Sequence, residues 1–339
     1  MARIALDAMG GDLAPQATVA GALLALAELD PAHCIQLVGS TPVVEAQLRT
    51  LLEGELATHA AQRERLTIIE APDVIEMTDK PSAVVRGKPN SSMAVGLRLQ
   101  AEGKSDAFVS AGSTGAQMVA SMMTLRMHAG LERPAIVTLF PSARKPVAVL
   151  DSGANVDCGA EELVQFARLG ATYVECVLGR PNPAVGLLSI GEEPEKGNAV
   201  TKEAHQLLQA SGLNFIGNVE GRDLPAGGTE REPVDVVVCD GFVGNVVLKF
   251  YEAIAPLMIG TLRTAGVSAE QLQAGLKHLD YSEYGGAPLL GVKGVSIISH
   301  GKSSPRAIKN AVKVAVQAVV SRMNDQIGAR LAAAAENAA

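Results

Sequence analysis

The chain has 339 residues, of which 47% are hydrophobic, so it can bury one or two sizeable cores and is too apolar to be disordered over most of its length. Its 36 Asp and Glu against 29 Lys and Arg give a formal net charge of -7, which argues against nucleic-acid binding. The four cysteines lie far apart without a CxxC pair, as expected for reduced thiols in a cytoplasmic protein. The acidic Asp7 interrupts the N-terminal apolar stretch before it reaches the length of a signal peptide, so we expect none. No uninterrupted apolar run approaches the roughly 18 residues of a membrane span.

Short apolar runs alternate with helical patterns from end to end. The runs are too short and too uniformly apolar for half-exposed strands, so they indicate buried, largely parallel strands. The alternation predicts a layered α/β fold, a largely parallel sheet flanked by helices. In chain order, we predict strand 4–7, helix 15–29, strands 35–39 and 66–70, helix 92–102, strand 107–110, helix 115–127, strands 135–140 and 147–151, helix 161–178, strand 185–190, helix 198–210, strands 215–217 and 234–239, helix 245–263, strand 295–298 and helix 305–322.

Neither an internal repeat nor a long linker divides the chain. We therefore expect residues 1–325 to form a single α/β domain with two lobes. Residues 225–233 are rich in Gly and charge, which predicts a surface loop, and the Ala-rich tail 326–339 is expected to fray.

Several loops after predicted strands carry the residues best suited to chemistry, because ligands of open α/β sheets bind beyond the carboxyl ends of the strands. In the first of these loops, Gly10 and Gly11 let backbone N–H groups approach an anion. A tight turn closed by Asp12 explains the same residues.

A second loop, residues 110–116, opens a helix. Its amides and the hydroxyls of Ser113 and Thr114 would meet at the positive end of the helix dipole, where phosphate or an acyl oxyanion can bind. The glycine spacing fits neither a Walker A loop nor GxGxxG.

Two further loops offer charged or amide side chains. Lys196 precedes a predicted helix and could meet an anionic substrate, or it could be a solvated lysine among glutamates. Asp240 ends a buried strand, where it could orient a ligand, accept a proton or cap the next helix. Asn245 lies near the start of that helix. Cys239 has no His nearby in the sequence and is interpreted as structural.

Metal and cofactor motifs are not found in the sequence. The six histidines show no HxH or HxxxH spacing and no Cys/His cluster, so we expect no zinc site, and nothing requires magnesium. There is no GxSxG elbow of a serine hydrolase. Gly301-Lys302-Ser303 resembles the end of a P-loop, but Ser296 stands where its first glycine is required. We expect no cofactor.

The motifs taken together, in order, resemble the PlsX family of acyl-acyl-carrier-protein:phosphate acyltransferases. The resemblance covers nearly the whole chain, and nine motifs in one order make it specific. They are residues 5–12, 73–77, 90–93, 110–116, 153–158, 163–166, 217–223, 235–249 and 280–291.

The resemblance implies a homodimeric α/β protein whose fold is related to phosphotransacetylases and to isocitrate and isopropylmalate dehydrogenases. It implies transfer of a long-chain fatty acyl group from acyl carrier protein to inorganic phosphate. The acyl phosphate product would pass to a membrane glycerol-3-phosphate acyltransferase for phospholipid synthesis. The enzyme would be cytoplasmic, with peripheral membrane association.

On this resemblance we hypothesise a role for each matching residue. Asn245 would donate to the thioester oxygen, Asp240 would orient the reacting groups, and Arg222 and Asp223 would lie at the rim. The residues expected to hold phosphate or developing negative charge are Gly10, Gly11, Ser113, Thr114 and Lys196.

The sequence departs from the family at three places. Ser113 replaces the usual Asn, Lys302 is an extra lysine, and the stretch 251–279 is shorter and less basic than usual. Residues 246–280 are still expected to form a helical excursion for dimer, membrane or acyl contact. A local basic patch with Arg263 and Lys277 would dock the acidic carrier protein.

Two other functions fit the sequence. One is a phosphate acetyl- or butyryltransferase that uses CoA, which would need a nucleotide pocket. The other is a non-catalytic scaffold that binds carrier protein without turnover.

Overall fold

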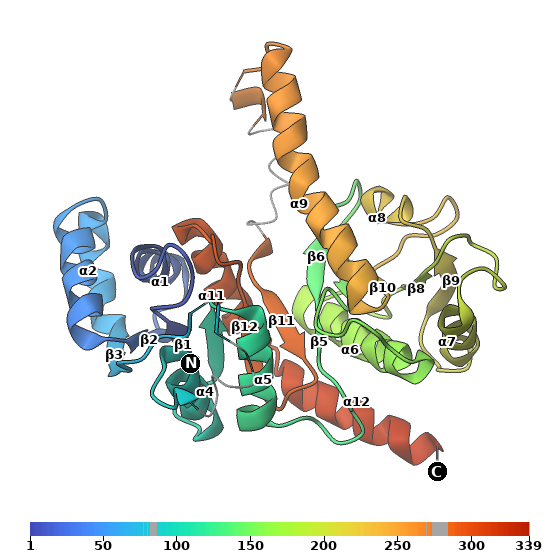
Figure 1. Ribbon diagram of the computed structural model, residues 1–339, viewed down its shortest axis with the longest axis horizontal. Helices are drawn as coiled ribbons and strands as arrows, with labels where there is room; N and C mark the ends of the chain where they lie inside the picture. Colours follow the sequence, from blue (N-terminus) through green and yellow to red (C-terminus); the bar gives the residue numbers. More distant parts are fainter. Residues whose placement is uncertain (77, 80, 82–86, 269, 273–283, 339) are drawn as a thin grey trace. The chain divides into compact units, whose positions relative to one another are not determined.

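The computed structural model describes residues 1–76, 78, 79, 81, 87–268, 270–272 and 284–338, which divide into two compact units (Figure 1). The first unit comprises Met1–Gly130 with Tyr284–Ala339, and the second comprises Leu131–Glu283. Each has its own largely parallel sheet with helices against it, so the predicted α/β class is confirmed.

The first unit is built on a sheet in the order β3-β2-β1-β4-β12-β11. Neighbouring strands pair in parallel, except that β11 is antiparallel to β12. Every residue of β4 and β12 is buried, which fits their largely apolar sequences, in which Ser110 and Ser296 are the polar residues. The strands are β1 (Arg3–Asp7), β2 (Cys34–Gly39), β3 (Leu66–Glu70), β4 (Ala107–Ser110), β11 (Ala287–Leu290) and β12 (Val295–Ile298). The helices are α1 (Gln16–Glu28), α2 (Thr41–Glu53), the 3-10 helix η1 (Ala57–Arg65), α4 (Ser92–Ala101), α5 (Thr114–Leu125), α11 (Pro305–Val320) and α12 (Met323–Ala338).

Helices α1 and α11 pack closely because a glycine lies at their contact. A Cβ at Gly21 would lie 2.5 Å from the Cβ of Ile308. At the end of α1, Glu28 accepts hydrogen bonds from Lys309 and Lys313 of α11 at 2.7 and 2.8 Å. These hydrogen bonds lower the pKa of Glu28 to about 2.

The second unit has a sheet in the order β6-β7-β10-β8-β9, in which only β6 is antiparallel to its neighbour. Its core includes Phe140, Val149, Val237 and Cys239. Helix α6 lies close to this sheet, since a Cβ at Gly170 would be 2.7 Å from a Leu150 methyl group. The strands are β5 (Ala135–Ile136), β6 (Thr138–Phe140), β7 (Val147–Leu150), β8 (Val185–Leu188), β9 (Phe215–Val219) and β10 (Val236–Val238). The helices are α6 (Ala160–Leu178), α7 (Ala199–Gln209), α8 (Asp223–Ala226) and α9 (Gly241–Thr264).

Helix α9 is long, apolar and exposed. Figure 1 shows it projecting from the sheet of its unit, and only Gly241 and Gly244 are buried in it. By length and composition it could cross a membrane, although, as expected, it contains no uninterrupted apolar run of that length. The sequence reading looked for an uninterrupted apolar run, whereas α9 contains Lys249 and Glu252, which form an ion pair at 2.8 Å.

Most predicted helices and strands are present in the structure, with bounds that differ by a few residues. The run 135–140 divides into two short strands, β5 and β6. Helices α2, η1, α8 and α12 and strand β11 were not predicted, and the expected loop 225–233 begins inside α8. Residues 326–338 continue helix α12, and fraying of this tail stays a prediction. Parts of the predicted excursion 246–280, Lys277, and the start of the motif 280–291 lie outside the described residues.

Candidate active site

Two of the predicted anion loops meet in the first unit. Strands β1 and β4 pair with Leu6 opposite Val109, so the loops that follow them emerge at one edge of the sheet. The Ser110 hydroxyl donates to Asp7 Oδ2 at 2.7 Å and accepts from the Gly112 amide at 3.0 Å. Burial raises the pKa of the Asp7 carboxyl, against hydrogen bonds from Ser92 and Ser110 that lower it.

Positions 10 and 11 require glycine because the two loops approach each other closely there. A Cβ at Gly10 would lie 2.6 Å from Asp7 Oδ2, and Gly11 has a φ of +103°, which L side chains rarely adopt. The carbonyl oxygen of Gly301 accepts from the Asp12 amide at 2.7 Å. The loop before α11 therefore lies beside the two glycines; in the sequence this segment matched no P-loop, and its extra Lys302 was interpreted as either a contact to the anion site or a solvated lysine.

Ser113 and Thr114 start helix α5. Ser113 is the N-cap, and its hydroxyl accepts from the Ala116 amide at 3.5 Å. The Ser113 hydroxyl therefore caps the helix in addition to any role in binding an anion. Ser113 is buried, whereas Thr114 is exposed. Both residues lie at the positive end of the α5 dipole, as the sequence predicted.

The remaining predicted site residues belong to the second unit, where Asp240 and Asn245 lie at the start of helix α9. Asp240 is the N-cap, and its Oδ1 accepts from the Val243 amide at 2.8 Å. The capping interpretation is therefore the one that its contacts support. Asn245 is exposed, and in the described part of the chain its carboxamide forms no side-chain hydrogen bond, so both its donors are available.

A buried carboxylate, Asp151, shapes the loop beside Asn245. Its two oxygens accept hydrogen bonds from the backbone amides of Ile136 and residues 153–155, at 2.6 to 3.2 Å. Burial raises its pKa, against these hydrogen bonds. The loop holds Gly153 with φ +128°, and a Cβ there would lie 3.4 Å from the Asn245 Cβ. The sequence reading missed Asp151, although an Asp at the end of a buried strand was the signal it had used for Asp240.

Lys196 and Arg222 differ in what surrounds their charges. Lys196 is exposed and forms no ion pair within the described residues, so its ammonium can meet an anion. Arg222 is also exposed, but it pairs with Glu220 at 2.7 Å and with Glu192 at 3.5 Å.

The predicted rim position of Asp223 is wrong. This residue is only 6% exposed, and its Oδ2 accepts from the Glu220 amide at 2.7 Å. Its carboxylate therefore closes the turn that leads into α8 and is not available to substrate.

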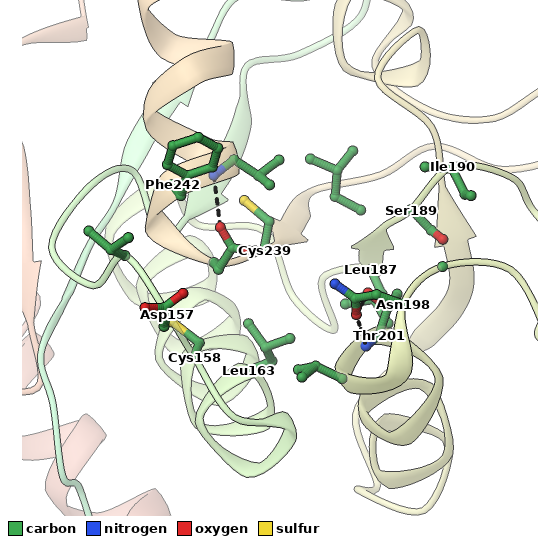
Figure 2. A pocket seen from close by; sticks show the side chains of 16 residues that line it. Asp157, Cys158, Leu163, Leu187, Ser189, Ile190, Asn198, Thr201, Cys239 and Phe242 are labelled. Carbon is green, nitrogen blue, oxygen red and sulfur yellow. Dashed lines mark hydrogen bonds between the residues drawn. The ribbon is translucent and has the colours of Figure 1, made fainter.

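A cavity of about 990 Å³ opens in the second unit beside the first turn of α9 (Figure 2). It lies at the carboxyl ends of β8 and β10 and at the N-terminal ends of α6, α7 and α9. Its walls are formed by Val156, Asp157, Cys158, Leu163, Leu187, Leu188, Ser189, Ile190, Gly197, Asn198, Val200, Thr201, Cys239, Asp240, Phe242 and Val243.

The cysteines of this cavity are poor nucleophiles. Burial raises the pKa of the Cys158 thiol to about 12 and that of Cys239 well above its usual value. The thiols are protonated at neutral pH, which agrees with a structural role for Cys239. Among the residues that the structure describes, no group of three His, Cys, Asp or Glu side chains is placed to hold a metal ion.

The fold is that of phosphotransacetylases. The EutD phosphotransacetylase from Staphylococcus aureus is similar with a TM-score of 0.59 and 15% identity, and the chains cover 94% of each other. A phosphotransacetylase from Streptococcus pyogenes has a TM-score of 0.62 and 17% identity, with the same coverage. A 4-hydroxythreonine-4-phosphate dehydrogenase from Salmonella typhimurium, described as putative, has a TM-score of 0.53 and 13% identity over 94% of this chain and 99% of that one. These likenesses define the fold.

The sequence comparisons define the family. A family profile described as "Fatty acid synthesis protein" matches residues 2–326. The phosphate acyltransferase of Desulforamulus reducens is 47% identical over 329 residues, 94% of each chain. That of Desulfitobacterium hafniense strain Y51 is 47% identical over 338 residues, 96% of each chain. The chain therefore belongs to the PlsX family, as its motifs indicated, and it is an enzyme of the acyltransferase class.

Proposed function

We propose that this enzyme transfers a long-chain acyl group from acyl carrier protein to inorganic phosphate and releases acyl phosphate. The observation that carries the proposal is the 47% identity, over almost the whole chain, to proteins named phosphate acyltransferase. In this reaction a phosphate oxygen attacks the thioester carbonyl carbon and forms the new C–O bond. The C–S bond then breaks, and the thiolate leaves and takes up a proton. Because phosphate is the nucleophile, no covalent protein intermediate is needed.

Asn245 is the proposed donor to the carbonyl oxygen. Its carboxamide is exposed and unpaired within the described residues, and it lies in the second turn of α9, close to the positive end of that helix. Asp240 holds the first turn of α9 and thereby orients Asn245. The same turn lies directly against Asp151, because a Cβ at Gly244 would clash with the Asp151 carbonyl oxygen, so this approach requires glycine.

Phosphate binding is assigned to Lys196 in the second unit and to the paired loops of the first. Lys196 is a cation without an ion-pair partner in the described part of the chain. In the first unit, Gly10 and Gly11 bring backbone close to the start of α5, where Ser113 and Thr114 lie. Arg222, already paired with two glutamates, has a smaller role at the rim.

The proposal extends to partners and location. The exposed apolar residues of α9, among them Phe250, Leu257 and Met258, support a homodimer contact or a peripheral contact with a membrane, where a glycerol-3-phosphate acyltransferase would take up the acyl phosphate. Arg263, in the last turn of α9, offers positive charge to the acidic carrier protein. We propose that the enzyme is located in the cytoplasm.

The proposal is tested by mixing the purified enzyme with palmitoyl-carrier protein, with and without inorganic phosphate, and trapping acyl phosphate with hydroxylamine. Hydroxamate that requires both phosphate and carrier protein is expected. If hydroxamate forms only from acetyl- or butyryl-CoA, the enzyme is a CoA-dependent phosphate acyltransferase. If a folded protein binds carrier protein and forms no hydroxamate, it is a scaffold.

A further inference from the structure

The cavity of the second unit has a largely apolar surface. Leu163 and Leu187, at 4% and 1% exposure, lie deep in its wall. Around it, Val156, Ile190 and Phe242 are 64%, 80% and 62% exposed. A single exposed apolar side chain is ordinary, but three line this cavity, with Phe242 and Ile190 on different sides of it (Figure 2), which favours an apolar ligand.

Some polar groups of the wall already have partners within the protein. Asn198 Oδ1 accepts from the backbone amide and the hydroxyl of Thr201 at 2.9 and 3.0 Å. Asp240 Oδ1 accepts from the Val243 amide. In the described part of the chain, the Ser189 hydroxyl is buried without a partner and is left to meet a ligand. These internal hydrogen bonds reduce the number of partners that the wall offers to a polar ligand.

The charges of the wall select against an anion. None of the 16 lining residues is Lys or Arg, whereas Asp157 and Asp240 contribute two carboxylates. These two carboxylates offset the positive ends of the α6, α7 and α9 dipoles, and the wall adds no Lys or Arg charge to hold phosphate or the nucleotide of CoA. A neutral hydrocarbon chain needs no such charge and removes apolar surface from water.

We infer that this cavity holds the fatty acyl chain of the donor, an inference that rests on the acyl transfer proposed above. Phe242 in the wall and Asn245 lie three residues apart on α9, about one helical turn. A thioester whose carbonyl oxygen contacts Asn245 can thus extend its chain past Phe242 into the cavity. About 990 Å³ is at the upper end of the volumes of small-molecule sites, roughly 300–1,000 Å³.

Chain-length preference follows from this placement. Each methylene that enters the cavity should raise kcat/KM about fourfold, until the cavity is full. The experiment measures kcat/KM with octanoyl-, dodecanoyl- and palmitoyl-carrier protein. Val200→Phe, on half-buried wall residue Val200, should lower the palmitoyl-to-octanoyl ratio at least about tenfold, because the ring takes the room of two or more methylenes.

Leu207→Phe is the matched control, because Leu207 is an exposed residue of the same helix and does not line the cavity. This variant should keep the wild-type ratio. The inference is overturned if a folded Val200→Phe enzyme keeps the wild-type ratio, or if it loses activity equally with all three chain lengths.

A second measurement uses the unmodified enzyme and needs no turnover. Cys158 lines the cavity, whereas Cys34 belongs to the first unit and serves as the internal reference. N-ethylmaleimide modification of both thiols is followed by mass spectrometry in phosphate-free buffer. Palmitoyl-carrier protein should slow modification of Cys158 at least about fivefold relative to unacylated apo-carrier, with no change at Cys34.

The outcomes separate this inference from the proposed function. Equal Cys158 rates with acylated and unacylated carrier overturn the assignment of the cavity, even if acyl phosphate forms in the hydroxylamine assay. Protection of Cys158 without any acyl phosphate supports the cavity as the acyl site and overturns the proposed reaction.

Discussion

Replacing Asn245 with Ala should separate catalysis from stability. The carboxamide is exposed and has no side-chain hydrogen bond among the described residues, so its removal leaves no buried group unpaired. Ala is also the better helix former in α9. We therefore expect the free energy of unfolding to change by less than about 0.5 kcal/mol, as for an ordinary surface substitution.

The effect on turnover should be much larger. Loss of one donor to a developing oxyanion lowers kcat by about 10²- to 10³-fold, or roughly 2.7–4 kcal/mol. Because Asn245 is exposed to solvent, we expect the lower end of that range, about 100-fold. The assay is hydroxylamine trapping at saturating phosphate and palmitoyl-carrier protein, with the melting temperature measured alongside.

Asn214→Ala is the control, since Asn214 is another exposed asparagine of the second unit and lies outside the proposed site. It should keep wild-type kcat. A folded Asn245→Ala enzyme with kcat within about threefold of wild type would show that Asn245 does not stabilise the transition state. A fall in kcat that is matched by a large drop in melting temperature would point to a structural role instead.

Three further predictions concern the anion sites and the first unit. Lys196→Ala should raise KM for phosphate about tenfold or more while the fold is kept, because it removes an unpaired cation; an unchanged KM in a phosphate titration would remove Lys196 from the site. Gly10→Ala should lower unfolding stability by about 1–3 kcal/mol in urea denaturation, because its Cβ would lie 2.6 Å from Asp7 Oδ2, whereas Gly221→Ala, with open space around it and no positive φ, should leave stability nearly unchanged. An equal loss in the two variants would mean that the Asp7 contact relaxes. The pKa of Glu28 is lowered to about 2 by its two lysine partners, so its contribution to stability is present above its ordinary pKa of 4.5 and is lost as pH falls from there towards 2. This contribution is small because the side chain is partly exposed, and melting curves of wild type and Glu28→Gln should converge over that pH interval; a constant difference would contradict it.

Local patterns in the chain were enough to predict the fold class, most strands and the loops that matter. A strand such as β4 is buried throughout, so its first three residues are apolar, and its limits, 107–110, agree with those predicted from the sequence. Glycine-rich loops after such strands mark positions where backbone must approach closely, as at Gly10 and Gly11. The order of the motifs was enough to identify the family, because nine motifs in one order do not recur by chance.

The roles of individual side chains could not be read from the sequence, because they depend on which backbone N–H groups the folded chain turns towards each carboxylate. Asp240 caps α9, Asp223 is buried in a turn, and Asp151 accepts amides from its own loop and from Ile136. All three are aspartates near element ends and look alike in the sequence. Whether a carboxylate faces substrate or backbone depends on which N–H groups the fold brings within about 3 Å of it.

For the cavity, too, the sequence determined which residues are apolar and only the tertiary structure determined their arrangement. Its wall combines segments from 156 to 243, and its buried residues Leu163 and Leu187 have sequence patterns typical of ordinary core residues. Hydrophobic patterning determines which side chains are buried, because the free energy of burial depends on the apolar area removed from water and not on which neighbours cover it. Which of those side chains leave a space between them is decided only when strands β8 and β10 and the first turns of α6, α7 and α9 pack together, since packing depends on the shapes of residues that are distant in the chain.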